Sequence, residues 1–87
     1  MIMNCTTIMA IVQSNRVETS TKVQEVLTKY GCNIRIRLGF NDSAADSCSN
    51  SGLILLQICG GEDGQVVKDM EKELNAIADV RVKYMDI

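Results

Sequence analysis

The feature that most constrains the fold is the order in which the hydrophobic pattern changes its period along the chain. Four short segments that are apolar or alternate in polarity read as strands: residues 6–13, 33–40, 53–59 and 80–85. Two longer segments with apolar residues every three or four positions read as helices: residues 17–30 and 62–78. Strand, helix, strand, strand, helix, strand is the order of a split βαβ unit, so the sequence predicts an α+β, ferredoxin-like βαββαβ sandwich.

These six elements use nearly all of the 87 residues, so a single domain spanning 1–87 is expected. In such a sandwich the four-stranded antiparallel sheet has the strand order 4-1-3-2, and both helices cover one of its faces. A chain of this length buries only about 60–65% of its exposable surface on folding, and self-association would therefore help to stabilise it.

Composition and charge exclude several classes of protein. No apolar run approaches the ~20 residues of a membrane helix, and the first five residues lack the basic start of a signal peptide, so a cytoplasmic location without a membrane is predicted. The net charge of −2 argues against direct nucleic-acid binding, which usually draws on a basic excess.

Histidine is absent, which removes the commonest metal ligand and the usual general base. We therefore expect a non-enzymatic domain without a cofactor. Four cysteines without a secretion signal are expected to be reduced thiols. Cys5 and Cys59 stand at ends of antiparallel strands that should meet, so they are weak candidates for a soft-metal site or a redox disulfide. Packing as small apolar side chains is the simpler interpretation of both.

The face of the sheet turned away from the helices is the predicted interaction surface. Strand alternation predicts that its apolar centre, the expected oligomer interface, consists of Met9, Ile11, Leu53 and Leu55. The edge strands are predicted to flank it with Arg35, Arg37, Arg81 and Lys83. The opposite set on the second strand should face the helices: Ile34, Ile36, Leu38 and Phe40. Such an apolar centre favours a homodimer or homotetramer over a chain end or loop that covers it.

Three segments carry a resemblance to a known family: IMAIVQSNR at 8–16, VQEVLTKYG at 23–31 and IRLG at 36–39. Together they resemble the iron-only hydrogenase system regulators, and the similarity extends over almost the whole chain. That family is similar to ACT domains and to the C-terminal domain of the nickel-responsive repressor, which are ferredoxin-like, oligomeric and sense small effectors. The resemblance implies a regulatory role.

The chain departs from those relatives in three respects. Without histidine it cannot carry over nickel sensing, and no helix-turn-helix is present for operator binding. The turn after the first strand lacks the glycine at which ACT domains often dock their effector.

We still expect a small effector to bind at an oligomer interface near this turn and the 41–52 loop, through Ser14, Asn15 and Arg16. The alternatives are a protein-interaction module that docks a partner through the open face, and a thiol-based sensor built on Cys5 and Cys59.

Overall fold

The computed structural model describes residues 5–41, 52–59 and 64–87. The strands in this part of the chain are β1 (Thr7–Gln13), β2 (Ile34–Asn41), β3 (Gly52–Ile58) and β4 (Val80–Asp86). The helices are α1 (Arg16–Lys29) and α2 (Gln65–Asn75), with a short 3-10 turn, η1 (Gly31–Asn33), between α1 and β2. Each predicted strand and the first helix begin and end within one residue of these bounds. Neither of these two helices is long and apolar enough to cross a membrane.

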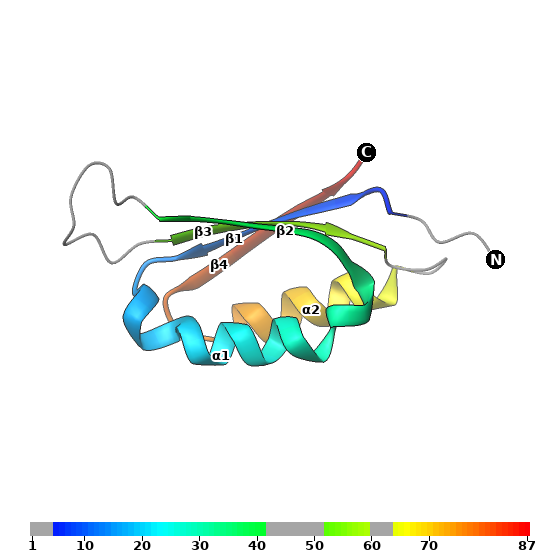
Figure 1. Ribbon diagram of the computed structural model, residues 1–87. Helices are drawn as coiled ribbons and strands as arrows, with labels where there is room; N and C mark the ends of the chain where they lie inside the picture. Colours follow the sequence, from blue (N-terminus) through cyan, green and yellow to red (C-terminus); the bar gives the residue numbers. More distant parts are fainter. Residues whose placement is uncertain (1–4, 42–51, 60–63) are drawn as a thin grey trace.

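The four strands form one antiparallel sheet in the order β2-β3-β1-β4, which is the predicted order read from the other edge. Both helices pack beneath one face of the sheet, and within the described residues no helix covers the other face (Figure 1). This α+β arrangement is compatible with the predicted ferredoxin-like sandwich.

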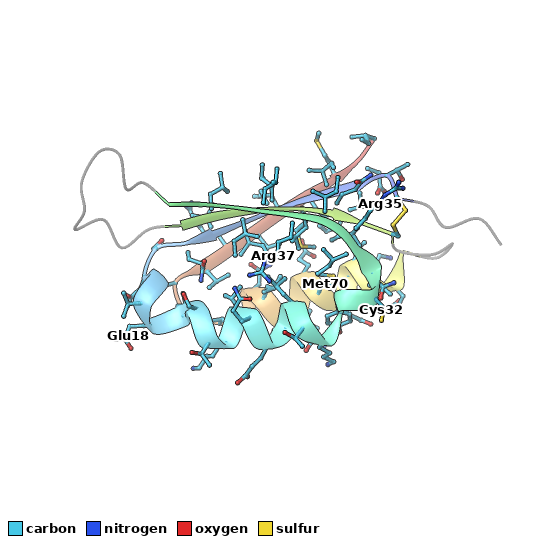
Figure 2. The ribbon with its side chains drawn as sticks, in the orientation of Figure 1. Glu18, Cys32, Arg35, Arg37 and Met70 are labelled. Carbon is cyan, nitrogen blue, oxygen red and sulfur yellow. A yellow bond between two sulfur atoms is a disulfide. The ribbon has the colours of Figure 1, made fainter. Side chains whose placement is uncertain are left out.

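The core lies between the sheet and the helix layer. Its most completely buried side chains come from both layers: Met9, Ile11, Val23, Leu56, Ile58, Met70 and Leu74. On α2 the buried residues are Val67, Met70 and Leu74, spaced by three and four positions, so one stripe of this helix faces the sheet. Figure 2 shows Met70 in the space between α2 and the strands.

β1 turns its larger apolar side chains toward the helices, which corrects the predicted face of this strand. Met9 lies opposite Leu56 and Ile11 lies opposite Ile54, and both Met9 and Ile11 are 0% exposed. The prediction that these two residues lie on the open face was wrong. Both alternate sets of β1 are apolar, so the sequence period alone could not decide which set the helices cover.

β2 changes face at an irregularity near its start, which corrects the prediction for this strand too. Ile34 pairs with Ile58, but Ile36 pairs with the next residue, Gln57, so Arg35 is an extra residue in the ladder. Ile34 therefore packs against the core, as predicted, whereas Ile36 and the following Leu38 point to the open side.

Arg37 takes the opposite face from the one predicted. It lies opposite the buried Leu56, and Figure 2 shows it on the helix side of the sheet. A single inserted residue reverses every later side chain of a strand, because side chains alternate with a period of two. The side chain of Phe40 lies outside the described part of the chain.

The joint between α2 and β4 uses a left-handed residue. α2 ends at Asn75, three residues before the predicted end, and Asp79 then has φ +66°. Its carbonyl accepts a hydrogen bond from the backbone N–H of Ser14, at 2.8 Å. The turn after β1 and the turn before β4 are thereby tied together at one end of the sheet.

Candidate functional site

The open face is the side of the sheet that no helix covers, and the strand register assigns its residues. Residues opposite one another in the ladder share a face, so the pairing can be followed across all four strands. The described side chains of the open face are Ile8, Ala10, Val12, Ile36, Leu38, Leu53, Leu55, Gln57, Arg81, Lys83 and Met85. Leu53 and Leu55 were predicted on this face; Ile36 and Leu38 were predicted on the other.

The outer strands of this face leave large apolar side chains in solvent. Ile36 is 49% exposed, Leu38 51% and Met85 60%, while the open-face residues of β1 and β3 between them are half-buried. The exposed residues lie on both edges of the sheet, so the apolar surface extends across all four strands. A continuous apolar surface of this kind marks an interaction site more often than a free surface.

Among the open-face residues assigned by the ladder, charge is confined to β4. Arg81 and Lys83 are exposed there, and none of the described side chains on this face is acidic. Of the basic flank predicted along β2, Arg35 lies on the open side at the start of the strand, whereas Arg37 points to the helix side (Figure 2).

Across the middle of the open face, the ladder aligns one residue from each strand: Leu38, Leu55, Ala10 and Lys83, in the order of the sheet. The open face is hollowed beside this row. A depression of about 180 Å³ is lined by Ile8, Ala10, Lys83, Tyr84 and Met85, between β1 and β4. The space is open because Ala10 has a small side chain, whereas its neighbours in the row, Leu55 and Lys83, have long ones.

Cys5 and Cys59 meet as predicted and form a disulfide at one end of the sheet (Figure 2). The expectation of reduced thiols was therefore wrong for this pair, and in the bonded state neither sulfur is a thiolate that could bind a metal. Neighbouring hydrogen bonds hold the bridge in place. Asn33 Nδ2 donates to the Cys59 carbonyl at 3.0 Å, and Gln57 Nε2 donates to the Cys5 carbonyl at 2.9 Å.

Cys32 is an exposed free thiol in η1, whereas Cys48 lies outside the described residues. Within the described ranges, no three His, Cys, Asp or Glu side chains gather in a way that could hold a metal ion.

The turn predicted to bind an effector lies at the opposite end of the sheet. Ser14 is exposed, and Asn15 precedes α1, where its carbonyl accepts hydrogen bonds from the backbone N–H and the hydroxyl of Thr19. Gln13 Nε2 donates to the same Thr19 hydroxyl at 3.2 Å, which ties the end of β1 to the first turn of α1.

Arg16 begins α1, and its side chain lies outside the described part, as does the 42–51 portion of the predicted effector loop. The strand ends bounding that loop meet near the turn, since Gly52 pairs with both Gln13 and Asn41.

A polar cluster joins the two helices on the far side of the core. The Tyr30 hydroxyl donates to the Glu73 carboxylate, and Lys29 Nζ forms an ion pair with the same carboxylate at 2.9 Å. The hydrogen bond from Tyr30, followed by the contacts with Lys29, lowers the pKa of Glu73 below its ordinary value of 4.5. The cluster is partly exposed and pairs all three groups with one another, so it serves to connect α1 to α2.

The comparisons with known proteins agree with this fold. The structure is similar to that of the uncharacterized protein TM1266 from Thermotoga maritima, with 25% identity, a TM-score of 0.79, and coverage of 93% of this chain and 94% of that one. It is also similar to part of a formyltetrahydrofolate deformylase from Pseudomonas putida KT2440, with 13% identity and a TM-score of 0.57. That match covers 94% of this chain but 29% of the deformylase, and it shows the fold alone. No family model and no curated protein matches the chain.

Sequence reasoning missed five of the eleven described residues of the open face. It did not place Ile8, Ala10, Val12, Ile36 or Leu38 there. On β1 a signal was present, since Ala10 and Val12 are smaller than Met9 and Ile11, and larger side chains fill a core better. On β2 no sequence signal predicts the bulge, because apolar and polar residues continue to alternate on both sides of the extra residue, Arg35.

Proposed function

We propose that this chain is a non-enzymatic, ACT-like regulatory domain, similar to the iron-only hydrogenase system regulators, which acts by association through its open face. The observation that carries the proposal is the apolar surface on the side of the sheet without helices, where Ile36, Leu38 and Met85 are about half exposed or more. The regulatory role rests on the sequence resemblance. A cytoplasmic location belongs to the same proposal, and there the Cys5–Cys59 bond would be reversible, because cytosolic thiols are kept reduced.

Association is favoured over a solitary domain by simple energetics. Each 100 Å² of apolar surface removed from water contributes about 2.5 kcal/mol before the costs of association are counted. A domain of 87 residues has a small core, and burying a second apolar surface adds to its stability. The surface suits a copy of the same chain or another protein that presents an apolar surface of its own.

The test of this proposal is to place a charge in the middle of the open face. Leu55→Glu should convert the associated protein to a monomer in analytical ultracentrifugation, or abolish binding of a protein partner, because a buried unpaired carboxylate is costly. Val17→Glu is the matched control, since Val17 is 74% exposed on α1 and its replacement should change neither property. If Leu55→Glu leaves both the mass and partner binding unchanged, the open face is not the interaction surface.

A second candidate function is effector sensing at the turn of Ser14, Asn15 and Arg16. It is favoured by the hydrogen bond from Ser14 to Asp79, which connects this turn to the joint between α2 and β4. A molecule bound there would contact two parts of the fold at once and could shift an equilibrium between two states for which its affinities differ.

Effector sensing is tested by a thermal-shift screen against amino acids, nucleotides and divalent metals. A ligand that raises the unfolding midpoint of the wild-type protein should fail to do so for the double variant Asn15→Ala/Arg16→Ala. The variant must keep the wild-type midpoint without ligand. Equal ligand-induced shifts in both proteins would remove the turn as the binding site.

A further inference from the structure

The open face has features that identify its occupant, provided that the proposed association through this face holds. It is broad, since its apolar residues come from all four strands of the sheet. A partner must offer an apolar surface of similar breadth. A second copy of this chain offers one of identical breadth, and two sheets that pack face to face interdigitate their side chains at about 10 Å separation.

Two copies related by a two-fold axis can align their sheets in two ways. With the axis parallel to the strands, β4 of one copy lies over β2 of the other, and β3 lies over β1. With the axis in the plane of the interface but perpendicular to the strands, each strand lies over its own counterpart. The side chains of the middle row distinguish the two arrangements.

Side-chain size favours the axis parallel to the strands. In that arrangement Leu55 of each copy stands over Ala10 of the other, so a large side chain enters the space beside a small one. The depression next to Ala10, about 180 Å³ in volume, is where that side chain would be accommodated. In the perpendicular arrangement Leu55 meets Leu55 and Ala10 meets Ala10, which crowds one pair and leaves a gap at the other.

Charge favours the same arrangement. Lys83, in the middle row of β4, would stand over Leu38 of the second copy, and its aliphatic stem could cover that exposed leucine while the ammonium group stays in water. In the perpendicular arrangement Lys83 would face Lys83, and no acidic side chain is present among the described residues of the face to relieve the repulsion.

We therefore infer that the open face binds a second copy of this chain, sheet against sheet, about a two-fold axis parallel to the strands, with β4 of each copy over β2 of the other. This inference names the partner and the orientation that the proposed function leaves open.

Cross-linking of introduced cysteines tests the orientation. Leu38→Cys and Lys83→Cys are each made with Cys32→Ser and Cys48→Ser, so that the native disulfide is kept, and a short bis-maleimide is added. An equal mixture of the two variants should give a cross-linked dimer, whereas neither variant alone should do so. The orientation would be overturned if Lys83→Cys cross-links by itself. It would also be overturned if the protein is dimeric but the mixture gives no cross-link.

A charge variant gives an independent measurement. Lys83→Glu mixed with wild-type chain should form heterodimers at the statistical fraction of one half, because the two charges lie far apart in the inferred dimer. A clear excess of heterodimer by native mass spectrometry would indicate β4 over β4 and overturn the inference.

The oligomeric state separates this inference from the proposed function. A wild-type chain that sediments as a monomer at all concentrations would exclude the second copy as the occupant. Loss of a protein partner in Leu55→Glu would in that case still support association through the open face.

Discussion

Ile8 and Ile11 lie three residues apart on β1 and point to opposite sides of the sheet. Ile11 is 0% exposed in the core between Ile54 and Val82, whereas Ile8 stands half-buried on the open face between Gln57 and Met85. The same residue type in the same strand therefore has two roles. One side chain holds the sheet to the helices, and the other is available to a partner.

Replacing each of these isoleucines by alanine should separate the two roles. In the monomer, Ile11→Ala should lower the free energy of unfolding by about 2–5 kcal/mol, through lost burial and the cavity left behind. Ile8→Ala should lower it by about 1 kcal/mol or less, because that side chain is already partly in solvent. Urea titration at a concentration where the chain is monomeric measures both. A larger loss for Ile8→Ala would mean that the faces of β1 are assigned the wrong way round.

Removing the bond between Cys5 and Cys59 should destabilise the protein. The disulfide closes a loop across a sequence separation of 54 residues, and the entropy of such a loop in the unfolded chain is worth about 2–5 kcal/mol. The double variant Cys5→Ser/Cys59→Ser should lose that amount, and dithiothreitol should lower the unfolding midpoint of the wild type but not of the variant. Cys32→Ser is the control, because this thiol is exposed and unbonded. A count of free thiols that does not rise by two on reduction would show that the bond is absent in solution.

The pH dependence of stability should reflect the carboxylate of Glu73. Its folded pKa lies below its ordinary value of 4.5, chiefly because the Tyr30 hydroxyl donates to it. A depressed folded pKa gives stability that is complete above pH 4.5 and is lost as the pH falls through the folded pKa. Glu73→Gln should be less stable than the wild type at pH 7 and lose less stability between pH 5 and pH 3.

Tyr30→Phe provides the matched control for this prediction. It removes the largest cause of the pKa shift and leaves the charge of Glu73 and its ion pair with Lys29 in place. Thermal midpoints across the acid range should therefore show a smaller pH effect in Tyr30→Phe than in the wild type. An unchanged pH profile in both variants would mean that this cluster makes no contribution to acid stability.

The left-handed backbone of Asp79 should restrict which amino acids are tolerated at this position. Its φ of +66° suits asparagine and aspartate but is strained for a β-branched residue. Asp79→Val should cost about 1–3 kcal/mol of unfolding free energy, whereas Asp79→Asn should be close to neutral. Equal stabilities of the two variants in a denaturant titration would show that the turn relaxes to another conformation. The hydrogen bond from Ser14 to the Asp79 carbonyl would then be lost as well.

Much of the fold was predictable from the sequence, because the elements are signalled by local periodicity. The stripe of Val67, Met70 and Leu74 identifies the buried face of α2 without any tertiary information. The alternation of Val80 and Val82 with Arg81 and Lys83 likewise assigns both faces of β4. The order of the elements then determined the topology, because few arrangements connect two such units with short loops.

The candidate site was less predictable, because it depends on which face of each strand is covered. For β1 both faces are apolar, and packing against α1 and α2 decided that Met9 and Ile11 are buried. For β2 the extra residue Arg35 reversed the strand after Ile34, and a bulge is a property of the pairing with β3, not of the β2 sequence.

The sequence by itself determined the helices and strands and their order, because hydrophobic periodicity is local. It also determined which face is buried in the elements that have one apolar and one polar face, such as α2 and β4. The tertiary structure alone decided that Ile8, Ala10, Ile36 and Leu38 form the open face, because strand register and the volume of the core are set by contacts between residues distant in sequence.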